Sequence, residues 1–335
     1  MSPSRSCSRV ALVGLLSGPF AGVALAVDWN SLPYTPHSTY QAIQSNGSSA
    51  YTGGFPIKIR GVVLNNTEDW LDPTPNYTST YQPFNMGGQA EIVVQAIDPG
   101  DFGGTFCWMG QNYGNLPFKA DPSLNYTNAE WTAELGRLGF FGGDNVTSPI
   151  RAGDLVEVRA RIGLHYAGKM NINEAHSKQP GNDFEVVLLQ AGYGLPTPTM
   201  LSLADLKDTS NNFLFDPTRV TGPERHQATR VRLTNVKLTG DTIANWGRNR
   251  DVTVEDALGR TLAVRLANHP DFATTLPPTD WLDIVGIFDQ ADSTVPHDSG
   301  YRLLVMNPSD VIIPEPASLG LLLGVGVLTV RRRRD

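Results

Sequence analysis

The sequence is poor in cysteine: it has two, Cys7 and Cys107, among 335 residues. Cys7 lies in an N-terminal segment that we expect to be removed, so the mature chain keeps one thiol and forms no intramolecular disulfide. Cys107 belongs to the alternating segment 103–108, a pattern typical of a strand. Because no histidine lies near it in the sequence to activate it, we predict a buried structural thiol and not a nucleophile.

Long helical periodicity and recognisable catalytic motifs are also missing. No G-x-S-x-G motif occurs, which leaves no serine in a strained nucleophile turn. The adjacent residues His297 and Asp298 resemble a catalytic His–Asp dyad, but we interpret their loop as a solvated hairpin. Without H-x-x-x-H or H-x-H spacing, a zinc site would have to be assembled by folding alone, so we expect no metal site and no catalytic residues. The histidines are scattered: His37, His165, His176, His226, His269 and His297.

Basic residues are outnumbered, 26 against 33 acidic residues. Six arginines and two acidic residues lie in the two end segments, which leaves 20 basic and 31 acidic residues between them, a net charge of −11. An acidic body repels phosphate backbones, so nucleic-acid binding is disfavoured. The second half of the body has one cationic stretch, which runs from Arg225 to Arg232 and is joined by Arg248, Arg250 and Arg265. Acidic residues lie nearby, and we interpret this stretch as a solvated outer face.

Acidic turns leave calcium as an alternative. Asp98 and Asp101 lie on one tight turn, and Asp251, Glu255 and Asp256 are close together. Neither group follows the spacing of an EF-hand loop or of a G-G-x-G-x-D repeat. Turn-forming aspartates explain both groups equally well. We therefore predict no cofactor and keep calcium as the alternative.

The first 26 residues have the three parts of a secretory signal peptide. Arg5 and Arg9 precede an apolar run that extends from residue 10 to residue 25. Small residues precede the bond between Ala26 and Val27, as in an A-x-A cleavage site. We expect passage through the export translocon and cleavage by signal peptidase. A retained membrane anchor is the alternative, but its glycines and proline weaken a long helix.

The last residues form a proline motif, an apolar run and a basic end. Pro314, Glu315 and Pro316 precede 14 uncharged residues, 317–330. This run is shorter than the roughly 20 residues that an untilted span needs. The four terminal arginines can snorkel, so a short span remains feasible. Their charge would hold Arg331, Arg332, Arg333 and Arg334 on the cytoplasmic side and leave the body outside.

This C-terminal segment resembles the PEP-CTERM sorting signal in its motif, its short apolar stretch and its arginine cluster. The resemblance implies recognition by an exosortase, a membrane enzyme that would cut near the motif. The protein would then be released or transferred to the cell surface or its polysaccharide matrix. Such tails occur in Gram-negative bacteria that make extracellular polymer. The resemblance covers only about 22 residues. It therefore implies where the protein is delivered and leaves the chemistry of the body open.

The body is rich in turn residues and its apolar runs are short, which predicts a mainly β fold. Two groups of strands follow one plan, in which a long strand, a strand pair, an Asp-containing strand and a closing strand succeed one another. This plan outlines two small OB-like β-barrels in tandem; a single β-sandwich is the alternative. The predicted strands of the first group are 57–64, 90–97, 105–108, 155–162 and 184–189. Those of the second are 228–238, 252–255, 261–266, 281–288 and 301–306, and the predicted helices are 128–138 and 201–207.

These patterns divide the chain into five predicted parts. The first barrel is expected to follow an extended N-terminal segment, and the second barrel to precede the sorting segment with its hydrophobic helix. The predicted parts are a signal peptide at 1–26, an extended segment at 27–54, a first barrel at 55–192, a second barrel at 193–313 and the sorting tail at 314–335.

An OB-like fold implies oligonucleotide or oligosaccharide binding on the face of its second and third strands. Phe106, Trp108 and Tyr113 are therefore candidates for stacking on a ligand; barrel core is the alternative for the first two. We predict an exported, noncatalytic protein that binds or organises extracellular polymer, with polysaccharide as the concrete partner. The alternatives are a secreted hydrolase, either nuclease or esterase, and a protein that binds extracellular nucleic acid.

Overall fold

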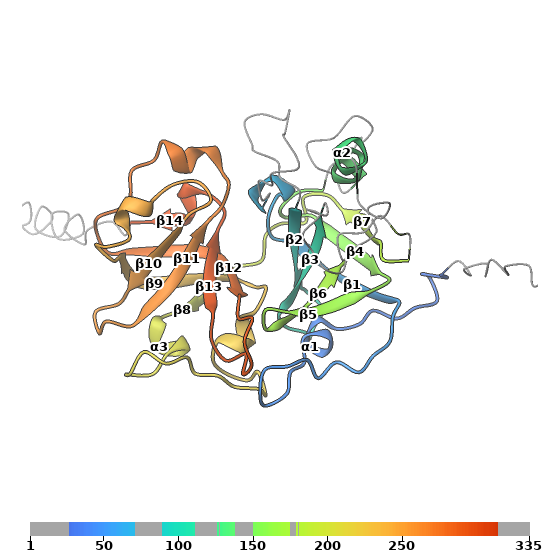
Figure 1. Ribbon diagram of the computed structural model, residues 1–335, viewed down its shortest axis with the longest axis horizontal. Helices are drawn as coiled ribbons and strands as arrows, with labels where there is room; N and C mark the ends of the chain where they lie inside the picture. Colours follow the sequence, from blue (N-terminus) through green and yellow to red (C-terminus); the bar gives the residue numbers. More distant parts are fainter. Residues whose placement is uncertain are drawn as a thin grey trace, which may run out of the picture.

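Two β-sheet units lie side by side in the computed structural model of the chain (Figure 1). The fold is mainly β with few helices, as the sequence predicts. The predicted signal peptide, the sorting tail and Tyr113 lie outside the described residues. The structure describes residues 27–70, 89–110, 126, 128–137, 150–174, 179 and 181–313.

The first sheet has seven strands in the spatial order β5-β6-β3-β2-β1-β4-β7. Its pairings are antiparallel except that between β3 and β6, which is parallel. Only residues 161 and 162 separate β4 from β5, yet the two strands lie far apart in the spatial order. The strands are β1 (Ile57–Val63), β2 (Gln89–Ala96), β3 (Gly104–Gly110), β4 (Leu155–Ala160), β5 (Gly163–Tyr166), β6 (Lys169–Asn173) and β7 (Phe184–Gln190).

The second sheet also has seven strands, in the order β14-β12-β13-β11-β10-β9-β8. A further antiparallel pairing between β12 and β9 closes β9 to β13 into a five-stranded barrel. Within it β11 and β13 are parallel, and the other neighbours are antiparallel. The strands are β8 (Thr199–Leu201), β9 (Arg230–Leu238), β10 (Asp251–Glu255), β11 (Thr261–Leu266), β12 (Leu282–Gln290), β13 (Tyr301–Val305) and β14 (Val311–Ile312).

The two sheets differ in their closing strand. In the second sheet the predicted closing strand, 301–306, is β13, and it pairs with β11. In the first sheet the predicted closing strand, 184–189, is β7, and it pairs with β4 at the edge of the sheet. The strand that lies parallel to β3 is instead β6. The prediction was wrong because β5 and β6 form a short hairpin whose polar residues hide its alternation.

The helices are few and short. The predicted helix at 128–138 is α2, and the one at 201–207 is reduced to a single turn, α3. Among the described residues, no helix is both long enough and apolar enough to cross a membrane. The helices are α1 (His37–Tyr40), α2 (Asn128–Arg137) and α3 (Leu203–Leu206), with 3-10 turns η1 (Thr67–Trp70), η5 (Pro223–His226), η6 (Ile243–Asn245), η7 (Pro270–Ala273) and η8 (Pro308–Asp310).

Each sheet encloses its own apolar core. On β2 and β3 the side chains of Ile92, Val94 and Cys107 face the first core. Cys107 is buried and forms no disulfide, as predicted, and burial raises the pKa of its thiol. On β12 and β13 the side chains of Phe288 and Leu303 face the second core. Period-two alternation therefore leaves the intervening residues of these four strands pointing away from both cores.

Those outward-facing residues form a third apolar cluster, which joins the two sheets. We call this contact, between the outer faces of β2–β3 and β12–β13, the seam. Because apolar side chains of both sheets are removed from water here, the seam stabilises one relative placement of the sheets. Its buried residues are Leu64, Val93, Phe106, Ala228, Ile287 and Leu304.

Candidate functional site

Two of the three candidate stacking residues, Phe106 and Trp108, lie at the seam. Phe106 is 1% exposed, and the Lys169 ammonium lies 4.7 Å from its ring centroid. Trp108 packs against the same cluster, and its indole N–H donates to Glu91. Because the second sheet covers Phe106, this ring offers no face to a ligand, and the stacking role predicted for it is wrong. Tyr113, the third candidate, lies outside the described residues.

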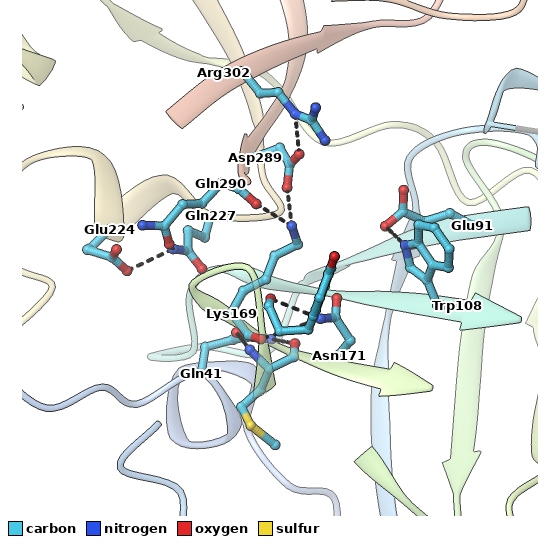
Figure 2. A network of polar contacts seen from close by, with 12 residues as sticks. Gln41, Glu91, Trp108, Lys169, Asn171, Glu224, Gln227, Asp289, Gln290 and Arg302 are labelled. Atoms are coloured by element: carbon cyan, nitrogen blue, oxygen red, sulfur yellow. Dashed lines mark hydrogen bonds and ion pairs between the residues drawn. The ribbon is translucent and has the colours of Figure 1, made fainter. Parts of the chain in front are cut away.

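A buried ion network crosses the seam (Figure 2). Lys169 Nζ, from β6, lies 2.7 Å from Asp289 Oδ1, on β12. Asp289 Oδ2 lies 2.7 Å from Arg302 Nε, on β13. Lys169 also donates to the backbone carbonyl of Gln290. Burial alone would raise the pKa of Asp289, but the two cations lower it below its usual range, so the carboxylate stays charged inside the seam.

Amide and carboxyl groups extend this network (Figure 2). Gln227 Nε2 donates to Gln290 Oε1 at 2.6 Å and to Glu224 Oε2 at 2.9 Å. The hydroxyl of Tyr301 donates to the other oxygen of Glu224. Burial raises the pKa of Glu224 to about 7. Since these polar groups satisfy one another, the network acts as a joint between the sheets and not as a ligand site.

The turn of the β5–β6 hairpin explains how Lys169 reaches the second sheet. Gly168 adopts φ +87°, and a Cβ at this position would overlap the side-chain amide of Gln290. Only glycine combines this conformation with so close an approach. The backbone N–H of Asp292 donates to the carbonyl of Ala167 at 3.2 Å, which fastens the turn to the second sheet.

The loop containing His297 and Asp298 joins the antiparallel strands β12 and β13 and is mostly exposed, as predicted, but two of its residues, Asp292 and His297, are buried. His297 is buried, and its backbone N–H donates to the carbonyl of Asn46 at 2.9 Å. Its ring contacts that of His165, on β5, with centroids 5.2 Å apart. These contacts with the N-terminal segment and with β5 hold His297 against the first sheet, while most of the loop, Asp298 included, stays exposed. His297 and His165 are thus a histidine pair at the seam.

The carboxylates of the acidic turns that made calcium an alternative already have partners within the chain. Asp101 accepts the backbone N–H groups of His37 and Ser38, each at 2.8 Å. The other carboxylates each have a basic partner, which would compete with calcium at these two groups. The pairs are Asp98 with Arg60, Asp251 with Arg265, Glu255 with Lys237 and Asp256 with Arg260.

The structure instead gathers three acids that sequence analysis did not connect. Single carboxylate oxygens of Glu134, Glu174 and Asp183 lie within 4.8 Å of one another. Glu174 is buried and accepts the Gly110 N–H and the Tyr126 hydroxyl, each at 3.0 Å. Burial and the neighbouring carboxylates raise the pKa of Glu174 to about 8. These residues come from α2, the end of β6 and the start of β7, so no local spacing signals the group.

A cavity of about 180 Å³ opens at the seam, lined by two carboxyl groups, one arginine and one histidine: Asp69, Asp310, Arg230 and His269. Asp69 is 3% exposed and accepts the Asn66 N–H at 2.9 Å. Burial raises the pKa of Asp69 to about 8, and the nearby Glu68 and Asp310 add to the rise. Burial also raises the pKa of Asp310. The cavity therefore brings together a carboxyl that is mostly protonated at neutral pH and a second carboxyl.

Of the remaining predicted features, Arg230 of the cationic stretch lines this cavity, whereas His37, Arg225 and Arg232 do not. His37 is buried between Thr105 Oγ1, 2.9 Å from Nδ1, and the Arg60 carbonyl, 3.2 Å from Nε2. Within the cationic stretch, Arg232 pairs with Asp283 at 2.7 Å. Arg225 lies over the Phe102 ring, 3.9 Å from its centroid. These cations are half-buried and already have partners within the chain.

No protein-family model matches the chain, and no curated protein matches it significantly. The interpretation of the site therefore rests on its own geometry.

Proposed function

We propose that the chain is an exported, noncatalytic module of two OB-type barrels that binds or organises extracellular polymer. Both sheets follow one pairing order, in which three antiparallel strands are followed by a strand that lies parallel to the third. In the first sheet, β4 and β5 act as one bent strand, which would complete the barrel from β1 around to β6. In the second barrel one continuous strand, β12, takes the place of β4 and β5, because it pairs with both β9 and β13.

The seam is the observation that carries this proposal. An enzyme that closes on its substrate between two units needs a joint that opens. Here an apolar cluster and the buried contact of Lys169 with Asp289 hold the sheets together. Breaking a buried ion pair by removing one partner costs about 3–5 kcal/mol. A joint of this strength suits a module that presents fixed surfaces to a polymer.

The two end segments support the export and surface sorting of this module. Their residue patterns suit export through the translocon, cleavage after Ala26 and recognition of Pro314, Glu315 and Pro316 by an exosortase. We propose transient anchoring in the inner membrane through the C-terminal segment. Release to the cell surface or the extracellular matrix follows.

Fractionation tests this address. The full-length gene is expressed in one host with an exosortase and in the same host without it. We expect the protein in the membrane fraction without the enzyme, and a shorter form outside the membrane with it. A matched Pro314→Ala/Pro316→Ala variant is expected to stay in the membrane in both hosts. A full-length membrane form in both hosts for the unaltered chain would contradict the sorting proposal.

A secreted hydrolase is the second candidate, and the cavity at the seam favours it. Asp69, with a pKa of about 8, resembles a general acid, and Asp310 is a second carboxyl in the same cavity. Paired carboxyls of this kind hydrolyse glycosidic bonds. The test measures sugar release from a panel of polysaccharides by the unaltered chain and by Asp69→Asn. If the unaltered chain hydrolyses a polysaccharide and Asp69→Asn keeps the fold but loses this activity, the hydrolase replaces the noncatalytic proposal. If the unaltered chain hydrolyses none of them, the noncatalytic proposal is supported.

A further inference from the structure

A hollow of about 320 Å³, open to solvent, lies on the first sheet away from the seam. Three segments enclose it: residues 34–39, which lead into α1, Arg60 on β1, and residues 98–101 in the turn between β2 and β3. Its volume is at the lower end of the range for small-molecule sites, about 300–1,000 Å³. It can admit a short stretch of a chain molecule but not a folded partner.

The polar groups around this hollow are held in place before any ligand arrives. The Arg60 guanidinium pairs with Asp98, and this hydrogen bond raises the pKa of Arg60. Burial alone would raise the pKa of Asp101, but N–H groups of Ser38 and His37 bond to it and lower the pKa. Asp101 therefore remains a charged acceptor. The hydroxyl groups of Thr35, Ser38 and Thr39 line the same hollow.

An aromatic ring forms one wall. The hydroxyl of Tyr34 donates to Glu157 Oε2 at 2.6 Å, which fixes the orientation of the ring. The ammonium of Lys58 lies 4.6 Å from the ring centroid, and the guanidinium of Arg60 lies 4.8 Å from it. A ring anchored in this way loses little conformational freedom when a ligand packs against it. Tyr34 is partly exposed and has these two cations over its ring, so its remaining surface is a preorganised apolar contact beside the polar groups.

We propose that this hollow binds a neutral carbohydrate chain, which names the ligand and the site of the polymer-binding function proposed above and rests on it. A sugar has hydroxyl groups that donate to carboxylates and accept from guanidinium, together with C–H faces that pack on aromatic rings. Among the residues that line the hollow, the carboxylates of Asp98 and Asp101 outnumber the single cation, Arg60, so the hollow disfavours phosphate and sulfate groups. The outer face of β2–β3, where an OB-type fold is expected to bind, is covered by the seam, whereas this hollow is open.

The test uses the full chain, freed from the membrane, and measures its binding to a panel of neutral and anionic oligosaccharides by calorimetry. Thr39 is exposed at the hollow, so Thr39→Trp fills the hollow without disturbing the core. Thr279 is exposed in the loop between η7 and β12, and Thr279→Trp is the matched control. We expect neutral oligosaccharides to bind, Thr39→Trp to weaken that binding at least about tenfold, and Thr279→Trp to leave it unchanged. A tenfold loss corresponds to about 1.4 kcal/mol.

Each other outcome has a distinct meaning. If neutral oligosaccharides bind Thr39→Trp as tightly as the unaltered chain, the polymer-binding function stands and this site is wrong. If the unaltered chain prefers anionic oligosaccharides, the assignment of a neutral ligand is overturned. If it binds no oligosaccharide at all, both the site and the polymer-binding function fail. Tyr34→Phe keeps the ring and removes its bond to Glu157, so a loss of binding in Tyr34→Leu that spares Tyr34→Phe assigns the effect to the ring.

Discussion

The second and third strands of the two sheets have the same topology but opposite surroundings. In the first sheet the outer face of β2–β3 is covered by the second sheet, through residues such as Val93 and Phe106. In the second sheet the outward-facing residues of β10–β11 include the exposed Asp251 and Ala263 and the partly exposed Arg265. The difference follows from the outward-facing side chains. Those of β2–β3 are mainly apolar and are removed from water, whereas those of β10–β11 are mainly polar and stay in water.

This contrast changes what an outward aromatic residue indicates. Phe106 and Trp108 have the character of ligand-stacking residues, but an exposed apolar patch of that kind is equally suited to another region of the same chain. The first sheet uses its patch to attach the second. Surfaces open to a ligand are therefore found where polar groups and rings are held without being covered, as around Tyr34.

We expect the largest difference in unfolding free energy between the covered face and the open face when an ion pair is broken on each. Lys169→Met removes one partner from a buried contact in which the Lys169 and Asp289 side chains are 8% and 2% exposed. We expect the free energy of unfolding to fall by about 3–5 kcal/mol, because Asp289 keeps only Arg302 inside the seam. Urea denaturation measures the change.

Arg265→Met is the matched variant on the open face, where its partner Asp251 is 62% exposed. We expect a loss of about 0–1 kcal/mol. Equal losses for Lys169→Met and Arg265→Met would contradict the distinction between a covered and an open face.

A smaller effect should follow from closeness of packing. A Cβ on Gly104 would overlap the backbone carbonyl of Ala228, from the second sheet, as well as that of Val94. Gly104→Ala therefore forces the backbones apart, and we expect a loss of about 1–3 kcal/mol. Gly240→Ala is the control, since nothing lies within 4 Å of a Cβ there. Thermal unfolding of both variants distinguishes them, and a Gly104→Ala variant as stable as the Gly240→Ala control would show that the seam is looser than described.

The smallest expected effect is a dependence of the seam on pH. Burial lowers the pKa of His165, and the adjacent His297 and Lys169 lower it further. The folded state therefore takes up a proton less readily than the unfolded state, so stability falls as the pH drops below about 6.5. We expect His165→Gln to flatten this fall in urea denaturation between pH 7 and pH 5. Thr253→Ala, on the open face, should keep the slope of the unaltered chain, and an identical slope in His165→Gln would exclude His165 as the source.

Local pattern predicts the strands of both sheets well, because alternation and turn residues are properties of neighbouring positions. The strand that lies parallel to β3 was missed, since the β5–β6 hairpin is short and its polar residues Lys169, Asn171 and Asn173 interrupt the apolar pattern. The sequence alone could not reveal that Lys169 is a buried ion rather than a solvated one. That requires knowing that Asp289, 120 positions later, lies opposite it.

The candidate sites were out of reach for the same reason. Asp69 and Asp310 line one cavity although they belong to the two ends of the described chain. The hollow beside Tyr34 joins three segments that only the fold brings together. Turn-forming aspartates were correctly identified as such at Asp98, but their orientation toward a shared hollow depends on the path of residues 34–39, which no local pattern predicts.

The last described strand has a mechanical consequence. β14 consists of Val311 and Ile312, which pair antiparallel with Ile284 and Asp283 of β12. If the chain were tethered through its carboxyl side, drag on the body would load this two-residue strand first. Its hydrogen bonds would break in succession and relieve the tension while the five-stranded barrel behind it stayed whole. The short strand would then detach before the barrel unfolds. A single-molecule pulling experiment through residue 313 should record a low-force detachment of β14 before the higher-force unfolding of the barrel.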